Sequence, residues 1–131
     1  MNTDGPLSAK GVIAKRVYDL EDRLLNFAAA VIDVSEKLPN TRAANHIAGQ
    51  ILRSGTSPYG NHSEAQAPES AEDFIHKMKI AAKEAEETKG WLMLCKYSKS
   101  YPEPDQLLQN LTSILKLLNK IISTAKQPSA N

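Results

Sequence analysis

Three histidines close in sequence to carboxylates are the first residues that could do chemistry. His46, His62 and His76 have Glu64 and Asp73 near them in the sequence. A di-metal site in a helical bundle would use Glu-x-x-His motifs on two helices together with further glutamates. No glutamate here is followed by histidine at the third position. We therefore interpret the histidines as interface or solvated residues and predict no metal and no cofactor.

Nucleophilic chemistry is no better supported. Cys95 falls in the apolar phase of a helical pattern, where a buried and inert thiol is the common case. Ser54 and Ser57 have no glycine-flanked elbow around them. The stretch GTSPYG lacks the lysine and the strand-to-helix context of a phosphate-binding loop. The sequence thus predicts a protein that is not an enzyme and has no small-molecule substrate.

Composition limits the partners and the setting. The 131 residues fit one domain, with 24% charged and 41% apolar residues. The net charge of +1 gives no strongly basic footprint for nucleic acid. A single cysteine excludes an internal disulfide. The beginning MNTDGPLSAKG lacks the apolar core of a signal peptide, and no apolar run is long enough to cross a bilayer. We expect a cytoplasmic protein without membrane contact.

Apolar residues at helical spacing predict an all-α protein. The first helix is expected from about Val12 or Tyr18 to Lys37, where Pro39 ends it. Asn40 or Thr41 can cap the second helix. The apolar faces of the first two helices are formed by Leu20, Leu24, Phe27, Val31 and Val34, and by Ala44, Ile47 and Ile51.

Two further helices complete an antiparallel up-down four-helix bundle. Ser70 and Asp73 resemble a capping box at the start of the third helix, which should end between Tyr97 and Lys99. Pro104 suits the first turn of the fourth helix. The third helix has a heptad seam of Phe74, Met78, Ala81, Ala85, Thr88, Leu92 and Cys95, and the fourth a wide apolar stripe from Leu107 to Ile122. We assign 12–126 to the bundle, 1–11 to a flexible arm and 127–131 to a frayed tail.

The segment RSGTSPYGNHSEAQ, residues 53–66, has the composition of a turn but keeps helical spacing. Arg53, Ser57, Asn61 and Glu64 are separated by four, four and three positions. A loop has no reason to keep that phase, so we predict a second helix that continues to about Gln66 and is kinked near Pro58. The alternative is a simple loop, in which proline and glycine carry no helical cost.

The same polar stripe predicts contacts between helices. Arg53 flanks the apolar face of the second helix, and Glu84 and Glu87 flank the seam of the third. We expect an ion pair from Arg53 to Glu84 or Glu87, which would specify register more than add stability. The alternative is that Arg53 points to solvent or across a subunit boundary. Asn61 and Glu64, on the same stripe, are also predicted to make polar contacts between helices.

A family resemblance rests on the run from His46 to Leu92. Its most specific parts are RSGTSP, Asn61 with Glu64-Ala65, and DFIHKMKIAAKEAEET followed by WL. Together with YDLEDRLLNFAAAVIDVSEKLP, it resembles the bacterial "four helix bundle protein" family, also called 23S rRNA intervening-sequence proteins, over about residues 18–96. The resemblance implies a ring-shaped assembly, often a homopentamer, and no enzymatic activity. A related accessory protein of diversity-generating retroelements binds nucleic acid and a reverse transcriptase, but that relative is strongly basic and this chain is not.

Excess apolar residues at helix edges predict self-assembly. Leu117 lies on the flank of the main stripe of the fourth helix, where a monomer would leave it wet. Trp91 lies at the edge of the third-helix seam, and a kinked second helix would expose Tyr59. Tyr59, Trp91 and Leu117 are therefore predicted at or near a subunit boundary. The alternative for Trp91 is that it closes the edge of its own bundle.

Two classes of function remain. One is a homo-oligomeric interaction scaffold or accessory subunit that works with another macromolecule. The other is a nucleic-acid-binding accessory protein, in which copies in a ring bring lysines into a basic band. The candidate lysines are Lys99, Lys116, Lys120 and Lys126. The alternative for these is ordinary solubilising lysines.

Overall fold

Four long helices account for nearly all of the residues that the structure describes. This computed structural model describes residues 9–99 and 101–127. The helices are α1 (Ala9–Lys37), α2 (Arg42–Ala65), α3 (Ala71–Tyr97) and α4 (Asp105–Lys126). No strand is present within these ranges. The predictions of an all-α chain and a four-helix bundle are confirmed.

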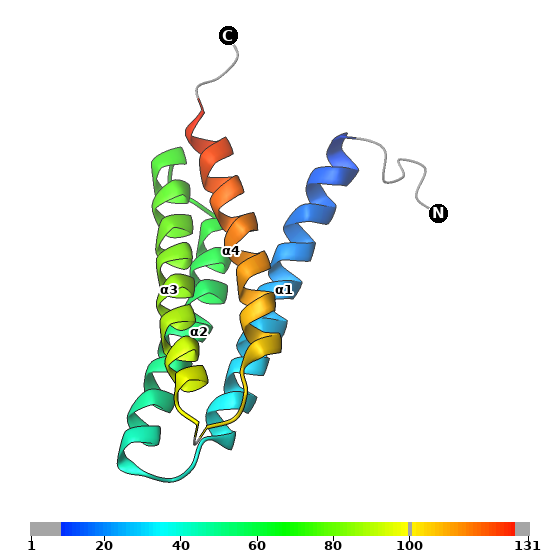
Figure 1. Ribbon diagram of the computed structural model, residues 1–131. Coiled ribbons are helices and arrows are strands. Elements are labelled where there is room, and N and C mark those ends of the chain that lie inside the picture. Colours follow the sequence, from blue (N-terminus) through cyan, green and yellow to red (C-terminus); the bar gives the residue numbers. More distant parts are fainter. Residues whose placement is uncertain (1–8, 100, 128–131) are drawn as a thin grey trace.

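Each helix packs against two others. α1 contacts α2 and α4, and α3 contacts α2 and α4. Figure 1 shows the α1–α2 and α3–α4 connections at one end of the bundle and the α2–α3 connection at the other. At the end where α1 begins, α1 and α4 diverge (Figure 1). An apolar cavity lies at this diverging end of the bundle.

Side-chain caps begin α2 and α3 at residues that the sequence predicted. Thr41 accepts a hydrogen bond from the backbone N–H of Ala44 at 3.2 Å, and Ser70 accepts one from that of Asp73 at 2.9 Å. The Asp73 carboxylate in turn accepts from the backbone N–H of Glu69 at 3.0 Å. Only the Ser70 half follows the capping box, because the Asp73 carboxylate bonds to the residue before the cap and not to the N–H of Ser70 itself.

Two expected boundaries differ from the structure. Residues 9–11 of the predicted arm belong to α1. Gly11 costs only about 1 kcal/mol in a helix, which the long helix that follows can offset. Residues 1–8, and 128–131 of the predicted tail, lie outside the described residues. Pro104 takes the N-cap position of α4 rather than its first turn. The missing N–H of proline costs nothing at either position, so the helix simply starts one residue later.

The predicted apolar faces form one core. The seam of α3 is buried from Met78 to Cys95, with Phe74 half-buried at the cavity end. The core draws on all four helices and includes Leu20, Leu24, Phe27, Val31, Ile51, Met78, Leu92, Leu111 and Leu118. The four faces read from the sequence therefore meet in a single interior.

The turn-like segment is helical. α2 runs without interruption through Gly55 and Pro58 to Ala65, so the loop alternative is wrong. Pro58 is fully buried on the inner face of α2. Hydroxyl and amide side chains bond back into the same turns: Thr56 donates to the Leu52 carbonyl oxygen at 2.7 Å, and Asn61 to that of Ser57 at 3.1 Å. The kink near Pro58 stays a prediction.

Gly55 of α2 lies in tight contact with Val31 of α1. A Cβ atom built on Gly55 would lie 2.7 Å from both γ-methyl carbons of Val31. Val31 is fully buried, and a β-branched side chain has little rotamer freedom in a helix. Only glycine fits at this contact, which explains why a helix carries it in spite of its poor propensity.

We predict that Gly55→Ala destabilises the fold by about 1–3 kcal/mol, the usual cost of overpacking a tight core. Gly49→Ala is the matched control, because it lies on the same helix and its added Cβ would meet nothing within 4 Å. The control should be stabilised by up to about 1 kcal/mol through helix propensity. Urea unfolding of both variants measures the difference. Equal stabilities for the two variants would show that the contact with Val31 does not constrain the fold.

Candidate functional site

A polar cluster joins the outer faces of α2 and α3. Arg53 bonds to the Glu84 carboxylate at 3.2 Å and also pairs with Glu87. Gln50 accepts a further bond from Arg53 at 3.3 Å. Arg53 therefore contacts both Glu84 and Glu87, the two carboxylates that the sequence predicted as alternative partners. The Arg53 side chain is 53% exposed, so the pairs contribute little to stability, on the order of 0–1 kcal/mol each.

Trp91 extends this cluster along α3. Its indole N–H donates to the Glu87 carboxylate at 3.4 Å. The ring of His46 from α2 meets the indole edge to face, with 5.9 Å between ring centres. Trp91 is half-buried and packs against the core. The cluster is therefore a seam of polar and aromatic groups between two helices, with no nucleophile or metal-ligand set among them.

The other two residues of the polar stripe behave differently from each other. Glu64 accepts from Lys77 across the α2–α3 contact at 3.1 Å, and Lys77 also lies 3.8 Å from Asp73. The hydrogen bond to Glu64, together with the Asp73 charge, raises the pKa of Lys77. Asn61 bonds only to Ser57, one turn back on its own helix. The predicted inter-helix contact of Asn61 is thus absent from the described part of the chain, because Ser57 satisfies the amide locally.

A buried hydroxyl pair lies beneath the polar cluster. Ser54 and Thr88 are both fully buried, and their hydroxyl oxygens are 2.9 Å apart. Thr88 Oγ1 also lies 2.8 Å from the carbonyl oxygen of Glu84. A hydroxyl has one proton and can accept as well as donate, so both contacts of Thr88 can be satisfied. This pair fixes the register of α2 against α3 in an otherwise apolar layer. The sequence showed both residues in the apolar phase but not that they meet.

We predict that Thr88→Val destabilises the protein by about 1–3 kcal/mol, because it leaves the Ser54 hydroxyl buried without its partner. Adding Ser54→Ala to that variant should recover most of the loss, since both polar groups are then gone. A double-mutant cycle in urea tests this. Simple additivity of the two substitutions would contradict the pairing.

His62 differs from the other histidines. His46 and His76 are exposed, whereas His62 is 2% exposed. Burial lowers the pKa of His62, and the nearby charge of Glu21 opposes that shift more weakly. Gln66 places its amide nitrogen 3.2 Å from Nε2 of His62. Nδ1 has no hydrogen-bond partner in the described part of the structure. A helical pattern can show that a histidine lies on the inner face, but not which ring nitrogen lacks a partner.

We predict that His62 makes stability fall with acidity. Its pKa in the folded state lies below that of the unfolded chain, about 6.5, so the unfolded state takes up the proton first. The stability that neutral His62 contributes is fully present above the pKa of the unfolded chain. It is lost as the pH falls from that pKa through the lower pKa of the folded state. Wild type should lose more free energy of unfolding between pH 7.5 and 5.5 than His62→Phe. His76→Gln, on an exposed position, should follow wild type; parallel curves for wild type and His62→Phe would contradict this assignment.

The residues predicted at a subunit boundary are half-buried in the single chain. Tyr59, Trp91 and Leu117 all pack against the core. Leu117 lines the groove between α1 and α4, so part of its side chain stays accessible. Larger apolar exposure occurs elsewhere: Leu25 is 48% exposed, Ile32 46%, Leu94 45% and Tyr97 80%. Leu25 and Ile32 each directly follow a core residue in sequence. Because of this adjacency, the sequence analysis did not identify them as exposed.

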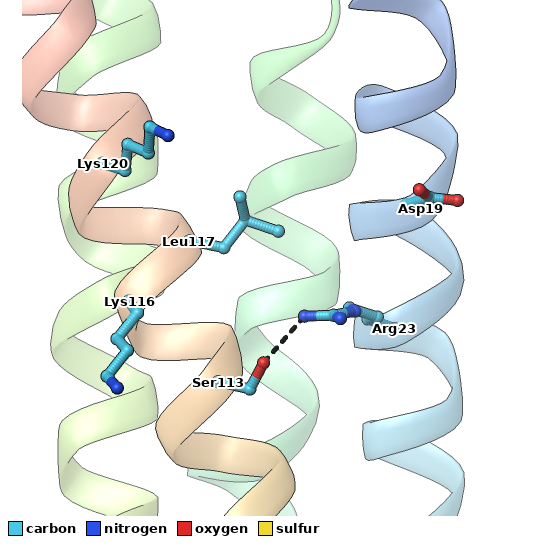
Figure 2. Close-up of a pocket in the computed structure, with 6 residues that line it drawn as sticks. All are labelled: Asp19, Arg23, Ser113, Lys116, Leu117 and Lys120. Atoms are coloured by element: carbon cyan, nitrogen blue, oxygen red, sulfur yellow. Dashed lines mark hydrogen bonds between the residues drawn. The ribbon is translucent and has the colours of Figure 1, made fainter. Parts of the chain in front are cut away.

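Two of the four candidate lysines line one groove between α1 and α4. Lys116 and Lys120 line it with Asp19, Arg23, Ser113 and Leu117, around a volume of about 370 Å³. Figure 2 shows Arg23 reaching across from α1 to Ser113, to which it donates a hydrogen bond of 2.9 Å. Lys99 and Lys126 are exposed and do not line this groove.

Three further observations concern metal binding, the single cysteine and membrane spans. Within residues 9–99 and 101–127, no group of three His, Cys, Asp or Glu side chains is placed to hold a metal ion. Cys95 is buried, and burial raises the pKa of its thiol. No helix in the described ranges is long and apolar enough to span a membrane.

The comparisons with known proteins agree with this fold. The family model of the 23S rRNA-intervening sequence protein matches residues 18–120. The chain belongs to this family. The match reaches beyond the residues that first suggested it and includes most of α4. No curated protein matches the chain.

A solved structure from the same family group supports the assignment. The chain is similar to a protein with unknown function from the S23 ribosomal protein family of Bacteroides thetaiotaomicron VPI-5482. The two share 35% sequence identity and a TM-score of 0.76, over 82% of this chain and 98% of the other. The family and the fold are thereby shown, and neither comparison supplies a biochemical function.

Proposed function

We propose that this chain is a non-enzymatic subunit of a homo-oligomer that acts as an interaction scaffold or accessory protein in the cytoplasm. The observation that carries the proposal is the exposure of four large apolar side chains on α1 and α3. Water contact with such groups is unfavourable, by about 25 cal/mol for each Å² that assembly could bury. Single exposed apolar residues are common, but these occur as pairs.

The pairs follow helix geometry. Leu25 and Ile32 are seven positions apart, two turns along one face of α1. Leu94 and Tyr97 are three positions apart on α3. Half-buried Tyr59, Trp91 and Leu117 can form the edges of such contacts, since aromatic and apolar side chains are enriched at the centres of interfaces. A ring, and a pentamer in particular, is proposed from the family resemblance.

Sedimentation equilibrium tests assembly directly. We expect a species several times heavier than the 14.4 kDa chain at micromolar concentration. Leu25→Glu with Ile32→Glu should shift it toward monomer, because burying two carboxylates in an apolar contact is costly. Asn26→Glu with Asn119→Glu adds the same charge at exposed polar positions and should assemble like wild type. A wild-type chain that stays at 14.4 kDa into the millimolar range would overturn the proposal.

Nucleic-acid binding is the second candidate, favoured by one observation. Arg23, Lys116 and Lys120 line the same groove, opposite a single carboxylate, Asp19. In the described part of the chain, neither lysine forms an ion pair. Repetition of this groove around a ring would make a basic band to which phosphates could bind, with Lys99 and Lys126 at its margins.

Titration against RNA and DNA at two salt concentrations tests the second candidate. Contact with phosphates predicts affinity that falls steeply with salt. Lys116→Gln with Lys120→Gln should reduce the salt dependence by about two phosphate contacts, and Lys99→Gln with Lys126→Gln by less. Binding that is absent at low salt, or indifferent to salt, would exclude it.

A further inference from the structure

An exposed apolar strip on α1 has a negatively charged margin. Leu25, Ala29 and Ile32 are exposed and follow one another at four and three positions, so they share one face of the helix. We call these three residues the α1 strip. Three exposed carboxylates lie three or four positions from a residue of the strip: Asp22, Asp33 and Glu36. The strip is therefore apolar along its length and acidic at its edges.

The acidic margin limits what the α1 strip can contact. Arg23 is the only cation between residues 19 and 36, and it lies two positions before Leu25, on a different face of the helix. In the described part of the chain, none of the three marginal carboxylates forms an ion pair. Two copies joined strip to strip would place like charges opposite one another, which is costly at an interface. The charge therefore favours a basic partner surface.

The groove between α1 and α4 has the opposite charge. It is lined by three cations and one carboxylate: Arg23, Lys116, Lys120 and Asp19. Half-buried Leu117 adds an apolar side chain to the lining, at the level between the two lysines (Figure 2). Arg23 bonds to the neutral Ser113, and within the described residues none of the three cations forms an ion pair. The groove thus keeps an excess of positive charge beside an apolar group.

Other surfaces with lysines are closer to neutral. On the outer face of α3, exposed Lys79 and Lys83 have exposed Glu86 as a neighbour. In the groove between α3 and α4, Lys96 is already paired with Asp105 at 2.9 Å. After Asp105, α4 contains no acidic residue. The α1–α4 groove is therefore the surface of this chain that best complements the acidic strip.

The α1 strip and the α1–α4 groove also match in length. Leu25 and Ile32 are seven positions apart, as are Ser113 and Lys120 on α4, and seven helical positions extend about 10 Å. The methylene stems of the lysines can cover the apolar strip while their ammonium groups reach the carboxylates at its margin. Because Arg23 and Leu25 lie on different faces of α1, one chain can present its groove to one neighbour and its strip to another.

We propose that the α1 strip of one copy docks in the α1–α4 groove of a second copy of this chain. The two surfaces differ, so the contact is head-to-tail, and its repetition gives a closed ring or an open filament according to the rotation between copies. This proposal rests on the proposed function, because it names the surfaces through which the copies meet. It also places Lys116 and Lys120 in a protein contact, whereas the second candidate function has them bind phosphates.

Charge reversal in the full chain, followed by sedimentation equilibrium, tests the contact. Asp22→Lys with Asp33→Lys reverses the margin of the strip, and Lys116→Glu with Lys120→Glu reverses the groove. Each double variant should associate about tenfold more weakly or worse, because like charges then meet. A chain with all four substitutions restores opposite charges and should regain most of the wild-type association. All four positions are exposed, so circular dichroism should show each variant folded.

An equimolar mixture of the two double variants tests the head-to-tail arrangement. In this mixture a strip meets a groove of opposite charge only on the other variant. Mixed assemblies should therefore form at concentrations where neither variant assembles alone. A mixture that stays as dissociated as its components, or a four-substitution chain no better than the double variants, would overturn the contact.

Lys79→Glu with Lys83→Glu is the matched control for the groove variant. It changes the charge by the same amount at two exposed lysines that are also four positions apart but lie outside the groove. This control should associate like wild type, and an equal loss in both variants would assign the effect to net charge and overturn the contact.

The same measurements separate this contact from the two candidate functions. A wild-type chain that stays monomeric would overturn the scaffold proposal together with the contact. Full association of the groove variant beside an assembling wild type would overturn the contact alone. If that variant instead loses only its salt-dependent affinity for RNA, the lysines bind phosphates and the second candidate is favoured over docking.

Discussion

The contact between Gly55 and Val31 is the constraint on which the rest of the bundle depends. At this level no side chain of α2 stands between its backbone and Val31, because a single added carbon would lie 2.7 Å from the valine methyls. On the neighbouring position, Ser54 meets Thr88 of α3 through a buried hydroxyl contact. Adjacent residues of α2 therefore fix two different partners. The small residues that resemble turn chemistry are the ones that let one helix lie close to both neighbours.

These contacts explain why local cost does not decide the conformation of residues 53–66. Glycine and proline weaken a helix by about 1 and 3 kcal/mol when nothing else acts on it. Here Gly55 permits close packing and Pro58 is buried in the interior. The burial of Ile51, Ser54, Pro58 and His62 along one face of α2 offsets the local preference. Tertiary packing thus overrides propensity.

The sequence predicted those parts of the structure that follow from helical phase. The α3 seam from Met78 to Cys95, the Thr41 and Ser70 caps and the pairing region of Arg53 are all set by spacing along one helix. What it could not supply depends on how far apart two helices lie. Asn61 bonds to Ser57 on its own helix, and Leu117 lies half-buried in the groove between α1 and α4, because both outcomes depend on interhelical distance. Leu25 and Ile32 were missed for another reason, because each directly follows a core residue in sequence.

The two ends of the bundle differ in packing because the buried residues along α2 differ in size. Its buried face changes from Ser54 and Gly55 to the larger His62, seven positions after Gly55 and thus about 10 Å along the axis. At the first level α1 lies against the backbone of α2, whereas at the second α1 and α4 diverge around a cavity that His62 lines. The close contact anchors the helices that form the cavity wall. A cavity built on such long, anchored helices keeps its shape better than one built on loops. The same series of small residues that makes α2 look like a turn therefore gives the bundle one closed level and one open level.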